Sequence, residues 1–258
     1  MNGYHVDSLL GGGSYGIVVR VYKEDRCYAM KVYYDQYLTQ KGHASGLTEY
    51  LFQREKSILL SIKFSTIPGY VDSFVCDNMY CLIQEFLPGN TLAALINQGQ
   101  RFCETEVRQL LSGLLEILNY LHIPGAEKPV IVHRDLRLSN IIVNDERLFL
   151  IDFGLAYRLQ NSADIDFLTE CASRKITADS SSSYMKKRND FSIQSDLFGA
   201  GVVAVDLFTN SISFDQSVSW EQHIPVSPSL KSFIRRLLAV DGKFASCNEA
   251  LEHLRWLK

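Results

Sequence analysis

Short runs of mostly apolar, β-strand-forming residues alternate with polar or glycine-rich turns through the first third of the chain, a pattern typical of β-strands. Five runs fit it: residues 4–12, 15–23, 26–34, 70–76 and 79–87. A glycine-rich turn separates the first two runs, and a Cys-Asp-Asn turn separates the last two. From Thr48, apolar residues recur three and four positions apart, which predicts one helix between the third and fourth strands.

Helical periodicity dominates the rest of the chain. Pro88 and Gly89 break the last strand, and Thr91 is placed to cap a helix. Further helices are expected at residues 104–122, 195–210, 227–240 and 247–257. The most apolar segment among these helices, residues 197–208, is only 12 residues long and includes Asp206, so it predicts a buried core helix and no membrane span.

The two patterns together predict an α+β fold of two lobes. A small β-rich N-lobe with one main helix covers residues 1–84, a hinge covers residues 85–89, and a larger, mainly helical C-lobe covers residues 90–258. A cleft is expected between the lobes. Residues 160–191, rich in Ser, Thr, Asp and Lys, fit neither lobe, and a loop of this length is usually functional or disordered.

Composition narrows the class of protein. The 258 residues are 47% hydrophobic, which is enough for a large core, and the formal net charge of −3 gives no basic excess that would indicate nucleic acid as a partner. Six cysteines form no CxxC pair, so buried, reduced thiols are expected. The N-terminus has no signal-peptide pattern, so we expect a soluble, cytoplasmic protein without a membrane segment. The sequence does not indicate an oligomeric state.

Glycines cluster in the stretch GGGSYGIV, residues 11–18. Without a Cβ, the backbone can approach phosphate closely and direct its amide groups at anionic oxygens. The β-branched residues that follow predict a strand, which argues against a dinucleotide-binding turn, because that turn leads into a helix. A glycine-rich hairpin turn without a function would have a similar sequence, so this stretch alone does not establish a phosphate-binding loop.

Lys31 lies in the middle of a predicted strand. The strand pattern leaves open whether its ammonium is solvent-exposed or points into the cleft, where it would need an acidic partner. Glu55 is a better candidate than Glu49, because it precedes the apolar pair Ile58 and Leu59 that would turn its helix inward.

Two aspartates follow predicted buried strands, Asp135 in VHRDLRLSN and Asp152 in LFLIDFGLA, with Asn140 between them. Carboxylate and amide oxygens at the ends of neighbouring strands suit Mg²⁺. The alternative is that these three residues have unrelated structural roles, each capping its own loop.

The motifs GGGSYGIV, YAMK, REKSILL, VHRDLRLSN, IDFGLA and SDLFGAG occur in the order and at the spacing of the eukaryotic-type protein kinase family. The chain resembles that family along nearly its whole length. The resemblance implies an ATP- and Mg²⁺-dependent enzyme that transfers the γ-phosphoryl group to a protein hydroxyl, with serine or threonine favoured over tyrosine. Its compactness suggests a minimal catalytic domain of bacterial type.

The resemblance also implies roles for single residues. Lys31, paired with Glu55, would hold the α- and β-phosphates, and the backbone of Glu85 and Leu87 would bind adenine beside the gatekeeper Gln84. The nucleotide-binding residues would be Leu10, Gly11, Gly12, Gly13, Ser14, Tyr15, Gly16, Ile17, Val18, Ala29, Lys31, Glu85, Leu87 and Ile142.

For the reaction itself, the resemblance makes Asp135 the base that accepts the substrate hydroxyl proton, and Arg137 a cation that reaches the γ-phosphate. Asn140 and Asp152 would hold Mg²⁺. Asp196 would anchor the central helix of the larger lobe to the catalytic loop.

Several positions depart from the family pattern. Arg137 and Leu138 stand where serine/threonine members usually carry lysine and proline. Residues 186–188, Lys-Lys-Arg, replace Ala-Pro-Glu, and Ala245 stands at the position of the arginine that pairs with that glutamate. Since loss of both partners of an ion pair can be nearly neutral, we expect an active enzyme with a looser activation segment.

Arg134, next to the catalytic aspartate, is typical of members that are regulated by phosphate on the activation segment. Candidate acceptors for autophosphorylation are Thr169, Ser173, Thr177 and Ser180 to Ser183, although a flexible polar tip would have the same composition. Two other functions stay open: a kinase or ATPase of the same fold acting on a small molecule or within an assembly, and a nucleotide-binding pseudokinase scaffold.

Overall fold

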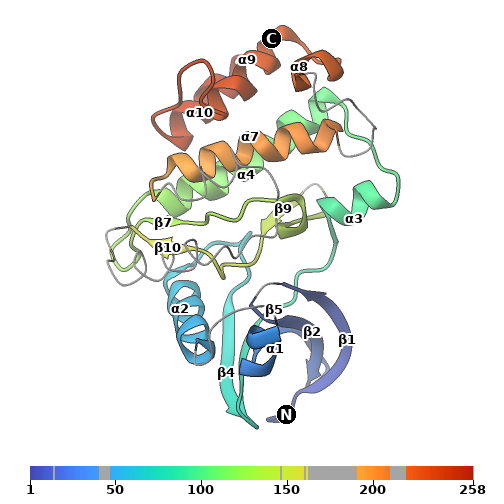
Figure 1. The fold of residues 1–258 in the computed structure, drawn as a ribbon, viewed down its shortest axis with the longest axis vertical. Helices are drawn as coiled ribbons and strands as arrows, with labels where there is room; N and C mark the ends of the chain where they lie inside the picture. The colour runs from blue at the N-terminus through green and yellow to red at the C-terminus, as the bar shows by residue number, and fades with distance from the viewer. Residues whose placement is uncertain are drawn as a thin grey trace.

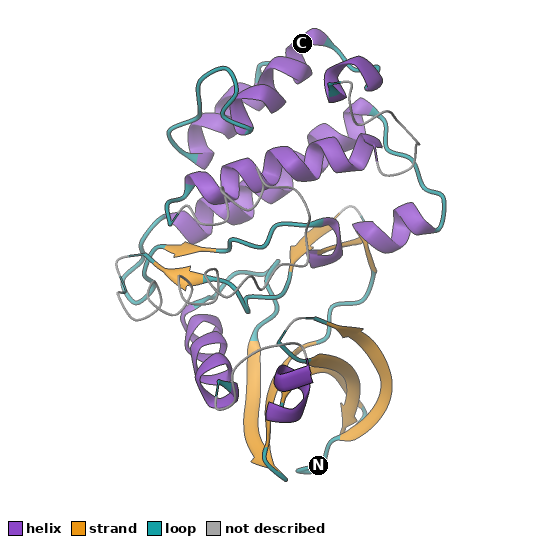
Figure 2. Ribbon diagram, in the orientation of Figure 1, coloured by secondary structure: helices purple, strands orange, loops and turns teal. Residues whose placement is uncertain are grey.

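The computed structural model describes residues 1–13, 15–40, 47–145, 147–159, 161, 191–209 and 219–257. Most strands gather at one end of the molecule and most helices at the other (Figure 2). This arrangement is the predicted α+β fold. The exact limits of the lobes, residues 1–84, 85–89 and 90–258, stay a proposal.

The β-rich part is a five-stranded antiparallel sheet in the order β1-β2-β3-β5-β4. Its strands are β1 (His5–Gly12), β2 (Ile17–Lys23), β3 (Arg26–Tyr33), β4 (Tyr70–Cys76) and β5 (Met79–Glu85), so all five predicted strands are confirmed. The turn between β4 and β5 holds Asp77 and Asn78 at φ 49° and 61°. Asp and Asn tolerate this conformation, which tight hairpin turns require.

Helix α2 (Thr48–Ser61) packs on this sheet and contacts β3, β4 and β5. Its buried residues Leu51, Ile58 and Leu59 lie on one face of the helix. Glu55 belongs to that face, because it is one turn from Leu51 and from Leu59. Burying the apolar face therefore carries the Glu55 carboxylate toward the sheet, as the sequence predicted.

Helix α1 (Asp35–Gln40) precedes α2 and was not expected from the sequence. Six residues are less than two helical turns, so no apolar periodicity can show in it.

The chain leaves the sheet through Gly89, β6 (Asn90–Thr91) and α3 (Leu92–Asn97). Gly89 has φ 132°, and a Cβ there would lie 2.5 Å from the Val143 carbonyl oxygen, so only glycine fits. The predicted cap is confirmed, because the Thr91 hydroxyl accepts a hydrogen bond from the Ala94 amide at 3.1 Å.

The helical part is built on α4 (Glu104–His122) and α7 (Gln194–Thr209), which lie side by side (Figure 1). It also contains α8 (Trp220–His223), α9 (Pro228–Leu237) and α10 (Cys247–Arg255). The leucine-rich face of α4 is buried, and most of α7 is buried as predicted. Within the described ranges, no helix combines the length and apolar character that crossing a bilayer requires.

Short strands lie between α4 and the large sheet (Figure 1). They are β7 (Ile131–Val132), β8 (Ile141–Asn144), β9 (Arg147–Leu150) and β10 (Tyr157–Arg158), with a 3₁₀ turn, η1, at Leu138–Asn140. Asp135 follows β7 and Asp152 follows β9. Both aspartates thus lie in loops of this middle layer, as the sequence predicted.

The cysteines fit the expectation only in part. All five described cysteines are free thiols, but only two of them, Cys81 and Cys247, are buried, and Cys103 is exposed. Cys171 lies outside the described residues.

Candidate active site

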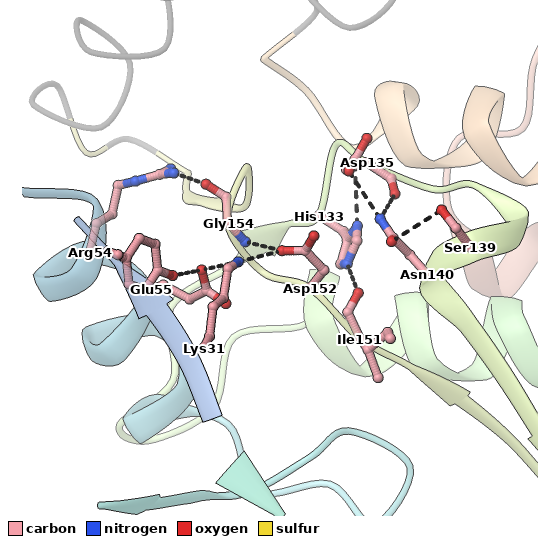
Figure 3. Close-up of polar contacts among 11 residues, drawn as sticks. Lys31, Arg54, Glu55, His133, Asp135, Ser139, Asn140, Ile151, Asp152 and Gly154 are labelled. Atoms are coloured by element: carbon pink, nitrogen blue, oxygen red, sulfur yellow. Dashed lines mark hydrogen bonds and ion pairs between the residues drawn. The ribbon is translucent and has the colours of Figure 1, made fainter. Parts of the chain in front are cut away.

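Lys31 on β3 connects three parts of the chain. Its ammonium nitrogen lies 2.8 Å from Oε2 of Glu55 on α2 and 2.7 Å from Oδ1 of Asp152, after β9 (Figure 3). The side chains of Lys31 and Glu55 are almost fully buried, which excludes an exposed lysine on this strand. Glu49, the weaker candidate in the sequence, interacts with Tyr80 instead.

The charges of this cluster reinforce one another. Burial lowers the pKa of Lys31, but the carboxylates of Asp152 and Glu55 outweigh that effect and raise it well above its usual value. Burial raises the pKa of Asp152, but the ammonium of Lys31 outweighs it and lowers the pKa to about 2. The Asp152 side chain keeps 40% of its surface exposed, so solvent screens part of this attraction. Both groups are charged at neutral pH.

Asp196 of α7 holds the loop that follows β7. Its buried carboxylate accepts hydrogen bonds from the backbone amides of His133, at 2.9 Å, and Arg134, at 2.8 Å, and contacts Nε2 of His122 at 2.8 Å. Burial raises the pKa of Asp196, but the contact with His122 outweighs it and lowers the pKa. Arg134 adopts φ 63°, a strained conformation for a residue with a side chain, and these bonds support it.

His133 joins this loop to the segment before Asp152. Its Nε2 lies 3.2 Å from the Ile151 carbonyl oxygen, and its Nδ1 accepts a hydrogen bond from the Asp135 amide at 3.3 Å (Figure 3). This pattern puts the ring proton on Nε2. The ring also packs edge-on against Phe153, with centroids 4.9 Å apart. The two aspartate loops therefore form one connected unit.

Asp135 and Asn140 orient each other. The Asn140 amide nitrogen donates to the Asp135 carbonyl oxygen at 2.9 Å and to its carboxylate Oδ2 at 3.0 Å. The other carboxylate oxygen, Oδ1, pairs with the Arg137 guanidinium at 2.8 Å. The structure thus brings three predicted site residues into direct contact, and both carboxylate oxygens of Asp135 are held in place.

The oxygen donors fit a magnesium ion bound together with a triphosphate. The side-chain nitrogen of Asn140 faces Asp135, so its amide oxygen points the other way, where the Ser139 hydroxyl approaches it at 3.5 Å. The backbone amide of Ile151, next to Asp152, donates to the backbone carbonyl oxygen of Asn140 at 2.9 Å. Nowhere in the described ranges do three or more His, Cys, Asp or Glu side chains group into a metal cage. Mg²⁺ commonly takes one or two carboxylates and completes its shell with phosphate oxygens and water.

The glycine-rich stretch forms the turn between β1 and β2. The Gly13 amide donates to the Gly16 carbonyl oxygen at 2.9 Å, and the Tyr37 hydroxyl donates to the Gly13 carbonyl oxygen at 2.6 Å. A Cβ on Gly16 would lie 2.5 Å from the Val32 carbonyl oxygen, whereas a Cβ on Gly11 or Gly13 would meet nothing within 4 Å. Close packing thus explains only one of these glycines, and the open side of the other two is compatible with an approaching anion.

The other predicted nucleotide-binding residues lie in this turn or on or next to strands of two sheets. Three of them, Leu10, Gly11 and Gly12, end β1. Tyr15 and Gly16 lead into β2, which begins with Ile17 and Val18. The remaining four lie further along the chain: Ala29 on β3, Glu85 at the end of β5, Leu87 after it, and Ile142 on β8. Val18 is paired with Lys31 across the sheet, and Ala29 with Gln84. Ser14 lies outside the described residues. The adenine-binding roles stay a prediction.

Sequence reasoning missed Tyr33 and Arg54. The Tyr33 hydroxyl donates to Oε2 of Glu55, and the buried Arg54 guanidinium donates to the carbonyl oxygens of Ala156, at 2.6 Å, and Gly154. Tyr33 could have been found, because residues two apart on a strand share a face and Lys31 marks that face. Nothing in the sequence pattern points to Arg54.

Arg134 lies against two aromatic rings. Its Cζ is 4.5 Å from the centre of the Phe191 ring and 5.7 Å from that of Tyr157, and the Tyr157 hydroxyl donates to the Phe191 carbonyl oxygen. Tyr157, shortly before the Ser- and Thr-rich segment, and Phe191, at its end, therefore meet at Arg134. The candidate phosphorylation sites Thr169, Ser173, Thr177 and Ser180 to Ser183, and residues 186–188, lie outside the described residues.

Ala245, at the position of the missing arginine, makes a hydrogen bond through its backbone amide. The Ala245 amide donates to Oε2 of Glu249 at 2.6 Å, and the neighbouring Phe244 carbonyl oxygen accepts a hydrogen bond from Gln194 at 2.9 Å. A hydrogen bond between uncharged groups, that of Gln194 to Phe244, thus connects the start of α7 to this loop.

Comparison with known proteins gives a consistent result. The family model for the protein kinase domain matches residues 4–256. The chain is 36% identical over 157 residues to the probable serine/threonine-protein kinase YbdM of Bacillus subtilis (strain 168), a match that covers 60% of this chain and 58% of that protein. It is 28% identical over 235 residues to serine/threonine-protein kinase B of Synechocystis sp., covering 84% of this chain and 39% of that protein. It is 27% identical over 274 residues to human serine/threonine-protein kinase H1, covering 97% of this chain and 60% of that protein. The matches thus span between 39% and 60% of the length of these relatives.

The ion pair between Lys31 and Asp152 predicts a pH effect. Because the pKa of Asp152 is lowered from 3.8 to about 2, the stability that this pair contributes is present above about pH 4 and is lost as the pH falls toward 2. Lys31→Met should raise the pKa of Asp152, because it removes the largest effect that lowers this pKa and leaves burial opposed only by the Gly154 amide and by His133. Carbon-13 NMR titration of the Asp152 carboxyl measures this pKa directly.

Lys63→Met is the matched control, because Lys63 is exposed and outside the site. It should leave the titration unchanged. An Asp152 carboxyl that titrates near 2 in the Lys31→Met variant would show that another group holds it charged.

Proposed function

Because the chain belongs to the protein kinase family, we propose that it is an ATP- and Mg²⁺-dependent protein kinase that phosphorylates serine or threonine in a protein substrate. The observation that supports this proposal most directly is the position of the Lys31 ammonium between Glu55 and Asp152. Opposite it lies the anchored loop that holds Asp135 and Asn140. These are the groups that phosphoryl transfer needs in order to position the reactants and to stabilise charge.

In this proposal the turn at residues 11–16 covers the triphosphate, and Lys31 exchanges Asp152 for phosphate oxygens while it keeps its contact with Glu55. Asn140 and Asp152 would then hold Mg²⁺, which neutralises charge on the phosphates when bound. The lowered pKa of Asp152 supports this role, since the carboxylate stays ionised at any working pH.

Asp135 would accept the proton of the substrate hydroxyl. Asn140 and Arg137 fix the direction of its carboxylate, so little reorganisation is needed when the hydroxyl arrives. From this position beside Asp135, the Arg137 guanidinium would stabilise negative charge on the γ-phosphate. Asp196 keeps this loop in its strained conformation through the two backbone amides.

The proposal extends to regulation and location. Autophosphorylation in the segment before Phe191 would place a phosphate near Arg134, which lies where that segment ends. A cytoplasmic location agrees with the free thiols of the five described cysteines.

The central test is a phosphate-transfer assay with labelled ATP and a general protein substrate. Asp135→Asn should lower kcat by about 100-fold or more, because it removes the general base while it keeps the size of the side chain. Lys31→Ala should lower kcat/KM for ATP, and phosphate should be mapped to serine or threonine. Asp145→Asn, the same chemical change at an exposed turn, is the control and should retain full activity.

The same assay separates the other candidate functions. A pseudokinase scaffold would bind ATP and transfer nothing, and a small-molecule kinase would label only a small-molecule acceptor. Either result with the wild-type chain would overturn the proposed protein substrate.

Autophosphorylation is tested by intact-mass spectrometry after incubation with Mg²⁺ and ATP. We expect added phosphate on the wild type and none on Asp135→Asn, with peptide mapping locating it between Gln160 and Phe191. A wild-type mass equal to that of the variant would refute this part of the proposal.

A further inference from the structure

Tyr33 is buried next to the ion pair at the centre of the site. It lies two residues after Lys31 on β3, so both side chains leave the same face of the sheet, the face that α2 covers. The Lys31 ammonium lies 5.3 Å from the centre of the Tyr33 ring. Phe52 of α2 packs edge-on against the same ring, with centroids 6.3 Å apart.

The Tyr33 hydroxyl donates to Oε2 of Glu55, the same oxygen that binds the Lys31 ammonium. The other carboxylate oxygen, Oε1, is buried and has no hydrogen-bond partner among the described groups. Glu55 therefore carries a buried negative charge with two donors, and both of them come from β3. A buried carboxylate that loses one of its few donors is strongly destabilised, so neither donor is dispensable.

The two donors to Glu55 differ in whether they must also bind another group during the reaction. Lys31 already divides its ammonium between Glu55 and Asp152, at 2.8 and 2.7 Å, and in the proposed reaction it also turns to the triphosphate (Figure 3). The Tyr33 hydroxyl has no such second task. Burial, followed by the negative charge of Glu55, raises the pKa of Tyr33 well above its usual value, so the phenol stays protonated and keeps its O–H group as a donor to Glu55.

We infer that Tyr33 is a positioning residue for phosphoryl transfer: its hydroxyl holds the Glu55 carboxylate, and with it α2, in place while Lys31 changes partners. This inference rests on the proposed kinase function. The hydroxyl acts on the reactants only through Glu55 and Lys31. Loss of the hydroxyl should therefore lower kcat/KM for ATP, although the groups that touch the nucleotide keep their chemical identity.

A double-mutant cycle tests the inference. Tyr33→Phe removes the hydroxyl but keeps the ring that packs against Phe52, and Glu55→Met removes the acceptor at similar volume. In the wild-type background, Tyr33→Phe should lower kcat/KM for ATP about 10-fold, the effect expected for one hydrogen bond to a charged group. In the Glu55→Met background, the same change should alter kcat/KM less than about 2-fold.

Tyr28→Phe is the matched control, because Tyr28 lies on the same strand but outside the Glu55 network. It should leave kcat/KM unchanged, and thermal unfolding should confirm that all variants are folded. A second readout does not need catalysis: calorimetry gives the dissociation constant of Mg·ATP for the same four proteins of the cycle, with the same dependence on Glu55 expected.

Two results would overturn the inference. One is an equal loss from Tyr33→Phe in both backgrounds, which would mean that the hydroxyl serves packing alone. The other is a Tyr33→Phe variant indistinguishable from Tyr28→Phe. A wild-type chain that transfers no phosphate would instead refute the proposed function, and the binding cycle would then decide on Tyr33 by the same criteria.

Discussion

One buried ammonium, that of Lys31, determines how the two parts of the chain meet. Glu55 comes from the helix over the sheet and Asp152 from the middle layer, so these two contacts of Lys31 connect three segments that are far apart in sequence. Removing one partner of the buried pair of Lys31 and Glu55 would leave an uncompensated charge, which typically costs about 3–5 kcal/mol. Asp152, with 40% of its side chain exposed, contributes less because solvent screens its charge. The arrangement therefore requires all three groups, and the same groups are those that a metal–triphosphate would need.

A second set of contacts keeps the opposite wall of the site rigid. Asp196 fixes the backbone of His133 and Arg134, and Asn140 fixes the carboxylate of Asp135. These hydrogen bonds are formed before any substrate arrives, so the cost of orienting the groups is met by folding and not by the reaction. The sheet side of the site depends on paired charges, whereas this side depends mainly on hydrogen bonds to the backbone.

Much of this could be predicted from the sequence, for physical reasons that apply to single elements. Short β-rich runs between turns predicted all five strands of the large sheet, and the choice of Glu55 as the partner of Lys31 followed from the apolar pair Ile58 and Leu59 on the same helix. What could not be predicted depends on geometry between elements. The bond of Tyr33 to Glu55 requires the distance of α2 from the sheet, and that of Arg54 to Gly154 requires the path of the chain after Asp152. Neither quantity is encoded in a local pattern.

The most direct test of the account is a crystal structure of the chain with Mg²⁺ and a non-hydrolysable ATP analogue. The account predicts that the Lys31 ammonium contacts the α- and β-phosphates and keeps its bond to Glu55, that Asn140 and Asp152 bind the metal, and that the Asp135 carboxylate faces the γ-phosphate. A triphosphate bound elsewhere, or a Lys31 that stays on Asp152 without touching phosphate, would contradict it.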